Sequence, residues 1–292
     1  MHDPATEVQV KTRVGVCSWS LRSPDARHLA ASVARFGVPR VQIALDPIRE
    51  DRAGWGEIEV LNALESRGIR IASGMMATQG EDYSTLESIA RTGGVRPDIT
   101  WGTNLRAAEQ NARLARRLGI NLVTFHAGFL PHEANAERGK LIRRLRQIVD
   151  VFDDAGVRVA FETGQESAET LLSVLNELDR PYAGVNFDPA NMILYGMGDP
   201  VAALVKLLPR VVQVHIKDAR ASNKPGSWGE EIAVGTGAVA WEKFFDTLYK
   251  GGFGGSLIVE REAGERRLED AIIARDVVTS HLRRLHAMGV AP

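Results

Sequence analysis

The sequence has little of several features that would assign it to a special class of protein. Its only cysteine, Cys17, cannot form an intramolecular disulfide, which makes a reducing compartment the default. With 36 Lys and Arg against 37 Asp and Glu, the 292-residue chain has no excess of one charge, which disfavours nucleic acid and anionic membranes as partners. No window reaches the roughly 18 apolar residues of a transmembrane helix, and the N-terminus lacks the apolar core of a signal peptide. We therefore expect a cytoplasmic enzyme with no membrane or nucleic-acid partner.

Short β-branched runs alternate along the chain with longer stretches of helical periodicity, a pattern typical of βα units and a parallel sheet. Most of these runs are continuously apolar, as expected for strands that are buried on both faces. We predict strands at Val14–Trp19, Val41–Leu45, Ile69–Gly74, Asn121–His126, Val157–Glu162, Ala183–Asp188, Val211–Lys217 and Ser256–Arg261. We predict helices near Pro24–Phe36, Glu57–Arg67, Asp98–Leu118, Asn135–Ala155, Ser167–Leu178, Pro200–Leu208, Trp241–Gly251 and Leu268–Ala287.

The residues at the ends of these helices agree with this division. Asp199 followed by Pro200 predicts a helix N-terminus. Glycine, which readily adopts the left-handed conformation of a C-terminal cap, follows four predicted helices and precedes the next strand. These glycines are Gly37, Gly68, Gly119 and Gly156.

Eight βα units with no linker between them predict an α/β fold, a single (β/α)8 TIM barrel that forms one catalytic domain over residues 14–292. A short disordered tail is expected over residues 1–13. A doubly wound open sheet is the structural rival, but it would normally place a glycine-rich turn after the first strand, where this chain reads CSWSLRSP. In a barrel, the long connections at residues 75–102 and 219–239 would lie on the active-site face as lids or substrate walls.

An ionisable residue stands at or near the end of each of the last five predicted strands. These residues are His126, Glu162, Asp188, His215 and Glu260. One such residue is more often a helix cap or a salt-bridge partner than a ligand, but the carboxyl ends of all barrel strands meet at one rim. Three carboxylates at one rim repel each other unless a cation binds between them. We therefore predict one divalent metal ion, and a set of oxygen ligands with one imidazole suits Mn²⁺, Mg²⁺, Co²⁺ or Zn²⁺.

The chain resembles the xylose-isomerase-like barrel superfamily of sugar (phosphate) isomerases and epimerases, which includes D-tagatose 3-epimerase, inosose dehydratase and endonuclease IV. The likeness extends from GVCSWSL at the first strand to the last helix. It is most specific in GVNFDPANMILYGMGDPVAAL, VVQVHIKDA, VGTGAVAWEKFFDTL and LIVERE. The resemblance implies that Glu162, Asp188, His215 and Glu260 bind the metal. It also implies that Glu162 and Glu260 are the acid/base pair on opposite faces of the substrate carbon. The resemblance is also compatible with a protein that forms homo-oligomers.

Five further residues are candidates for binding the substrate, and each has a purely structural alternative. His126 could instead be a hydrogen-bonded core histidine, and Lys217 an ion pair at the rim. Trp19 could stack on a sugar or simply pack, as could Trp101 and Trp228. The two remaining candidates are Asn191, which falls where epimerases of this family commonly carry His, and Gln165, which could reach the substrate or cap a helix.

The function predicted from these residues is a divalent-metal-dependent isomerase or epimerase. Its substrate would be a small carbohydrate: a sugar, keto-sugar or sugar phosphate that reacts through a metal-stabilised enediolate. No cluster of Arg and Lys marks a phosphate pocket, which favours an unphosphorylated substrate. A dehydratase or lyase that acts on a keto-sugar or keto-inositol needs the same metal and base, and this alternative stays open.

Two more distant functions are disfavoured. An endonuclease IV-like nuclease needs additional histidines on strands two and three, where this chain has VQIALD and IASGMM. A non-enzymatic binding protein on a degenerate barrel would not need the intact set of four metal ligands.

Overall fold

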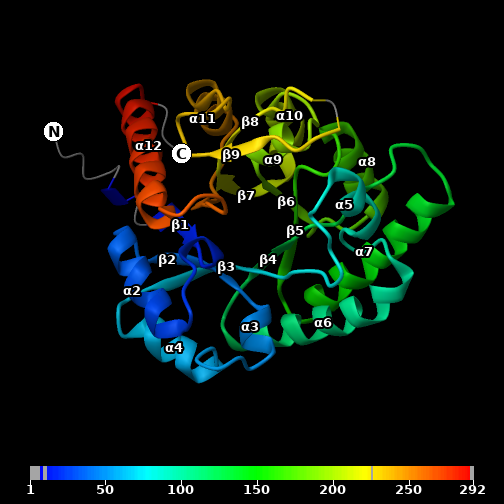
Figure 1. The fold of residues 1–292 in the computed structure, drawn as a ribbon, viewed down its shortest axis with the longest axis horizontal. Helices are drawn as coiled ribbons and strands as arrows, with labels where there is room; N and C mark the ends of the chain where they lie inside the picture. The colour runs from blue at the N-terminus through cyan, green and yellow to red at the C-terminus, as the bar shows by residue number, and fades with distance from the viewer. Residues whose placement is uncertain (1–6, 9–11, 225, 290–292) are drawn as a thin grey trace.

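Eight parallel strands form a closed barrel inside a ring of helices (Figure 1) in the computed structural model, which describes residues 7–8, 12–224 and 226–289. Each strand pairs with its neighbours in chain order, and the last pairs with the first, which confirms the predicted barrel and excludes the open sheet. The barrel strands are β1 (Val14–Cys17), β2 (Arg40–Ala44), β3 (Arg70–Met75), β4 (Leu122–Phe125), β5 (Arg158–Glu162), β6 (Gly184–Phe187), β7 (Val211–Ile216) and β10 (Ser256–Val259).

The longer helices bury one face each against the outside of the barrel. In the first of them, residues 26, 29, 30, 33 and 36 are buried, which is the spacing of one helical face. None of the helices in the described part of the chain is long and apolar enough to cross a membrane. The helices are α2 (Ala26–Phe36), α3 (Asp46–Arg49), α4 (Glu57–Glu65), α5 (Leu86–Thr92), α6 (Asp98–Arg117), α7 (Ala136–Asp154), α8 (Ala168–Leu178), α9 (Pro189–Leu194), α10 (Pro200–Leu207), α11 (Trp241–Lys250) and α12 (Arg267–Ala287), with 3-10 turns at Trp19–Leu21 and Leu208–Arg210.

The predicted helix ends are confirmed. Asp199 accepts a hydrogen bond from the backbone N–H of Ala202 (2.7 Å) at the start of α10, and Pro200 occupies its first turn. All four predicted cap glycines have φ between 63° and 84°, a region that favours glycine. Most of the predicted tail at residues 1–13 lies outside the described residues, and β1 begins at Val14 as predicted.

Several predicted strands are one or two residues too long at their carboxyl ends. The first ends at Cys17 instead of Trp19, because Trp19 begins a 3-10 turn. Asp188 and Glu260 likewise follow β6 and β10, although Glu260 continues the ladder by donating its N–H to the carbonyl oxygen of Ile216 (3.1 Å). Parallel pairing ends where the chain turns toward the next helix, so Asp188 and Glu260 stand just beyond their strands, whereas Glu162 and His215 belong to the last residues of β5 and β7.

The two long connections contain structure that the sequence pattern did not reveal. Residues 75–102 include α5, and residues 219–239 belong largely to a two-stranded antiparallel hairpin of β8 (Asp218–Arg220) and β9 (Glu230–Ile232). Both connections rise from the carboxyl ends of barrel strands, β3 and β7, and so border the same mouth of the barrel.

Asp218 holds the second of these connections in place. Its buried carboxylate accepts hydrogen bonds from the backbone N–H groups of Gly235 (2.9 Å), Gly237 (3.1 Å) and Val239 (3.2 Å), and from the indole N–H of Trp241 (2.9 Å). A Cβ on Gly237 would collide with Oδ1 of Asp218, which explains a glycine there. One carboxylate therefore fixes the end of the connection against the barrel.

We expect Asp218→Asn to lower the free energy of unfolding by about 2–4 kcal/mol, because an amide keeps one acceptor oxygen but turns an NH₂ group toward buried N–H donors. Urea denaturation measures this change. Asp199→Asn is the matched control, since asparagine caps a helix as well as aspartate, and it should change the free energy by less than about 0.5 kcal/mol. Equal effects of the two substitutions would contradict the anchoring role of Asp218.

Candidate metal centre and substrate cavity

Four side chains converge at the carboxyl ends of four neighbouring strands, β5, β6, β7 and β10. Glu162, Asp188, His215 and Glu260 each offer one ligand atom, and these atoms all lie within 4.8 Å of one another. Nδ1 of His215 is 3.3 Å from Oε1 of Glu162, 3.2 Å from Oε2 of Glu260 and 3.9 Å from Oδ2 of Asp188. The structure thus brings together the four residues that the sequence analysis selected as metal ligands.

The chemistry of this cluster fits a divalent cation. All four side chains are almost fully buried, yet Nδ1 of His215 and Oδ2 of Asp188 have no hydrogen-bond partner in the described structure. Burial, with the charges of Glu260 and Glu162 nearby, raises the pKa of Asp188 well above its ordinary value, although Lys217 opposes this. Carboxylate oxygens and one imidazole nitrogen are suitable ligands for several divalent ions. A cation held by the four atoms would satisfy both unpaired atoms and reduce the repulsion.

A glutamine orients the imidazole of His215. Its Nε2 lies 2.8 Å from Oε1 of Gln42, and Nε2 of Gln42 in turn donates to Oγ1 of Thr124 (2.8 Å), so the amide oxygen faces the ring. Nδ2 of Asn186 is also near this ring nitrogen (3.1 Å), but it has Oε2 of Glu162 as an acceptor (3.3 Å). Because an acceptor oxygen at 2.8 Å favours a proton on Nε2, the neutral imidazole of His215 would direct the lone pair of Nδ1 toward the cluster.

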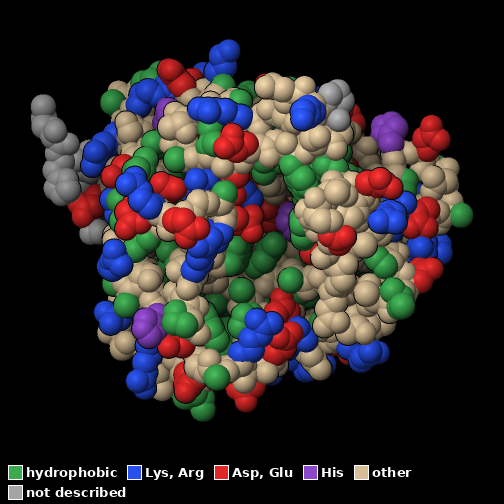
Figure 2. All heavy atoms as spheres, viewed as in Figure 1, with side chains coloured by type: hydrophobic (Ala, Val, Ile, Leu, Met, Phe, Trp, Pro, Cys, Tyr) green, Lys and Arg blue, Asp and Glu red, His purple; other side chains and the backbone are tan. Residues whose placement is uncertain are grey.

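A cavity of about 530 Å³ opens above the cluster. Figure 2 shows the hollow in the middle of this face of the molecule, bordered by hydrophobic and acidic side chains. Its lining includes Glu81 and Tyr83 from residues 75–102 and Trp228 and Glu231 from residues 219–239. Both long connections therefore form substrate walls, as the sequence analysis expected.

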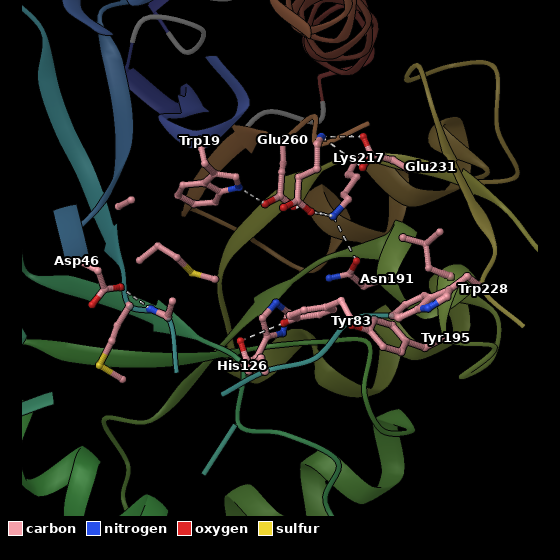
Figure 3. A pocket seen from close by; sticks show the side chains of 17 residues that line it. Trp19, Asp46, Tyr83, His126, Asn191, Tyr195, Lys217, Trp228, Glu231 and Glu260 are labelled. Carbon is pink, nitrogen blue, oxygen red and sulfur yellow. Dashed lines mark hydrogen bonds and ion pairs between the residues drawn. The ribbon is translucent and has the colours of Figure 1, made fainter. Parts of the chain in front are cut away.

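Four of the five predicted substrate-binding residues line this cavity (Figure 3), and each also lies beside one of the two glutamates of the cluster. The indole N–H of Trp19 donates to Oε1 of Glu260 (2.6 Å), and Nζ of Lys217 donates to Oε2 (3.1 Å). On the other side, Nδ2 of Asn191 donates to Oε1 of Glu162 (3.0 Å), and Nε2 of His126 lies 3.7 Å from the same oxygen. Each glutamate therefore has its own pair of neighbours.

Gln165 does not line the cavity. It is buried, and its Nε2 lies 3.5 Å from the hydroxyl oxygen of Tyr195, which does line it. The alternative of a helix cap is wrong, because Ser167 caps α8 through the N–H of Thr170 (3.3 Å). Gln165 can act on a substrate only by holding Tyr195.

The remaining tryptophans and the cysteine have different positions. Trp228 lines the cavity, whereas Trp101 lies outside it under the guanidinium group of Arg144, 5.0 Å from the ring centre. Cys17 is fully buried, as expected of a small apolar residue.

The charge of Lys217 keeps its neighbouring glutamate ionised. Burial by itself would raise the pKa of Glu260, but Lys217 and then His215 outweigh it and hold that pKa well below the ordinary value. Lys217 also lies 2.8 Å from Oε2 of Glu262, and its pKa is raised well above the usual range because these carboxylates outweigh its burial. Glu262 shares the inward side with Glu260, as strand alternation predicts.

Several functional residues escaped the sequence analysis. Gln42 is a lone polar residue in the apolar run VQIAL, and this break in the run was the one available signal. Asp46, Tyr83 and Tyr195 line the cavity from segments that the pattern left as loops or helix ends. No spacing rule connects them, because the tertiary fold alone brings them to one cavity.

Comparison with known proteins agrees with this architecture. A family model described as xylose isomerase-like TIM barrel matches residues 25–280. The L-ribulose-5-phosphate 3-epimerase UlaE of Shigella sonnei is 24% identical over 263 residues, 85% of this chain and 87% of that protein. A xylose isomerase domain protein from Planctomyces limnophilus is 29% identical, with a TM-score of 0.80 over 94% of this chain and 97% of that one. The structure of an L-ribulose 3-epimerase, 15% identical, has a TM-score of 0.72 over 96% and 98% of the two chains.

We expect the purified wild-type protein, supplied with Mn²⁺ and then gel-filtered, to retain about one equivalent of the metal. Glu162→Gln and Asp188→Asn should lose it, because each replaces a charged ligand oxygen by a neutral amide. Elemental analysis measures the content, and Asp46→Asn, which removes a carboxylate of the cavity lining outside the cluster, should retain the metal. Metal retained by both ligand variants would contradict this assignment of the site.

We expect Gln42→Leu to weaken Mn²⁺ binding about 10–100-fold, because the imidazole loses the acceptor that holds its proton on Nε2. Calorimetric titration of the metal-free protein measures the affinity. Thr124→Val removes a polar group from the same buried network one step farther from His215, and its affinity should stay within about threefold of wild type. Equal losses in both variants would mean that the network acts through general packing and not through the ring orientation.

Proposed function

The chain belongs to the xylose isomerase-like TIM barrel family, and on that premise we propose that it is a divalent-metal-dependent isomerase or epimerase that acts on a small carbohydrate. The names of its relatives support a sugar isomerase or epimerase in general terms. The observation that carries the proposal is the pair of glutamates, Glu162 and Glu260, which stand at the carboxyl ends of the outer two of four neighbouring strands and accept hydrogen bonds from different donors.

These two glutamates are suited to move a proton to and from a substrate carbon. Oε1 of Glu162 is hydrogen bonded to Asn191, and Oε1 of Glu260 is hydrogen bonded to Trp19, so both carboxylates are held in place by neutral donors. One of them removes the proton from the carbon next to a carbonyl, and the other returns it on the opposite face, which inverts that carbon. Epimerisation by this route uses two acid/base groups, and Glu162 and Glu260 are suited to these two roles.

The neighbouring donors bind and orient the substrate. Lys217, Asn191 and His126 all line the cavity beside the cluster, where their N–H groups can meet substrate hydroxyl and carbonyl oxygens. A divalent cation held by the four ligands would polarise the carbonyl and stabilise negative charge on its oxygen. Tyr195 and Trp228 pack edge to face, 4.8 Å between ring centres, and form an apolar wall that limits the access of water to the reacting carbon.

Solvent deuterium exchange tests the proposal. The metal-loaded protein, incubated in D₂O with a panel of ketoses, should place one deuterium on the carbon next to the carbonyl and form the epimer or isomer. Glu260→Gln, assayed in excess metal and with its metal content measured, should lose about 10²–10⁴-fold of this activity, because acid/base groups contribute that much. The matched control is Glu265→Gln, whose exposed side chain is paired with Arg22 away from the cavity, and it should retain full activity.

Three outcomes separate the alternatives. Exchange with an epimeric or isomeric product supports the proposal. Exchange followed by loss of water identifies the dehydratase or lyase that the sequence analysis left open. No exchange with any keto-sugar, although the metal site is filled, would contradict both reactions.

A further inference from the structure

We propose that the cavity selects an uncharged carbohydrate and rejects one that carries a phosphate at the end distant from the metal cluster. This inference rests on the proposed function and narrows its substrate to one chemical class. The curated relative from Shigella sonnei is named for a phosphorylated sugar, so the selectivity would distinguish this chain from that protein.

The charges that line the cavity are predominantly negative. The lining contains one ammonium group, that of Lys217, among its described residues, and this group is already paired with Glu262 (2.8 Å) and Glu260 (3.1 Å). A phosphate group in this space would meet carboxylates and find no unpaired Lys or Arg among the described lining residues. The carboxylates that line the cavity belong to Asp46, Glu81, Glu231, Glu260 and Glu262.

Two arginines lie behind this acidic lining instead of facing the cavity. Nη1 of Arg261 is 2.9 Å from Oε1 of Glu231, and its Nε is 3.0 Å from Asp270. Nη2 of Arg49 is 2.9 Å from Oδ1 of Asp46, and neither arginine lines the cavity. Guanidinium groups in these positions are already paired with carboxylates and cannot form the bidentate contact that phosphate prefers.

Backbone N–H groups are the other common phosphate ligands, and two of them in the connection at residues 75–102 donate to carboxylates that line the cavity. At the start of residues 75–102, the N–H of Ala77 donates to Oδ2 of Asp46 (2.7 Å). Farther along the same connection, the N–H of Gly94 donates to Oε1 of Glu81 (3.0 Å). The acidic side chains therefore take the donors that a phosphate-binding loop would leave free.

The far wall of the cavity is aromatic. Figure 3 shows Tyr83, Tyr195 and Trp228 gathered on one side, with Asp46 across the cavity. The ring centres of Tyr83 and Trp228 are 6.5 Å apart, those of Tyr195 and Trp228 are 4.8 Å apart, and Leu194 lines the cavity beside them. Such a wall matches the C–H surface of a sugar, and its three aromatic side chains carry no positive charge to compensate a buried anion.

Deuterium exchange by the metal-loaded protein, measured on fructose and fructose 6-phosphate and on ribulose and ribulose 5-phosphate, tests the selectivity. We expect kcat/KM for the free sugar to exceed that for its phosphate by at least about 10-fold in the pair that reacts. One uncompensated like charge about 10 Å away gives a factor of this size at an effective dielectric constant near 20. Glucitol and glucitol 6-phosphate have no carbonyl group and do not react. Calorimetric titration with these two compounds therefore measures the same preference as a ratio of binding affinities.

A matched pair of variants shows whether the acidic lining causes the preference. Glu262→Gln removes one carboxylate from the cavity and should reduce the preference for the free sugar or polyol about threefold or more. Glu265→Gln makes the same change of charge on a side chain that is 89% exposed and outside the cavity, and it should leave the preference unchanged. The preference should also shrink as the salt concentration rises, because salt screens the repulsion.

The outcomes separate this inference from the proposed function. Faster exchange or tighter binding with the phosphorylated compounds overturns the inference and leaves the proposed function standing. Binding of glucitol without exchange on any sugar supports the inference and contradicts the proposed function. Binding of neither glucitol nor its phosphate overturns the inference, because the cavity would then take no uncharged carbohydrate.

Discussion

The electrostatic repulsion among three buried carboxylates around His215 is the constraint on which the rest of the site depends. Glu162, Asp188 and Glu260 stand on three different strands, and the closed barrel forces their ends to one rim. Buried like charges at this separation are tolerated only with protons, cations or hydrogen-bond donors beside them. The chain supplies one fixed cation, Lys217, and a set of neutral donors. Nδ1 of His215 and Oδ2 of Asp188 still lack a hydrogen-bond partner among the described residues, and a divalent ion between them would supply one.

Buried polar groups elsewhere in the barrel are arranged to hold this cluster in one geometry. Gln42 is fully buried and joins His215 to Thr124, so that the imidazole presents one defined nitrogen. Asp218 lies two residues after the end of β7, the strand that contains His215. Its carboxylate binds the backbone of the connection that carries Trp228 and Glu231. In both cases one side chain satisfies several buried partners, which makes its position difficult to change without loss of stability. Metal ligation and the shape of the cavity are thus linked through neighbouring residues of the same strands.

The cavity combines a site that favours oxygen-rich substrates with walls that disfavour negative charge. Its floor offers carboxylates and N–H donors for a polyhydroxylated carbon chain, while its sides are aromatic or acidic. The barrel scaffold leaves the side walls to the connections after β3 and β7, whose residues can change without disturbing the metal ligands. Members of one family can therefore keep the same centre and differ in the substrate that reaches it.

The sequence by itself determined the barrel, because apolar runs followed by helical stretches can bury their faces in few other ways. It also identified Glu162, Asp188, His215 and Glu260, because residues at the ends of parallel strands must meet at one rim. Gln165 was assigned less well, because its contact with Tyr195 depends on packing that no pattern along the chain expresses. Only the tertiary structure decided how Gln42 orients His215 and how the charges of the walls are paired. Those features depend on distances between segments far apart in the chain, and periodicity reports only which face of an element a residue occupies.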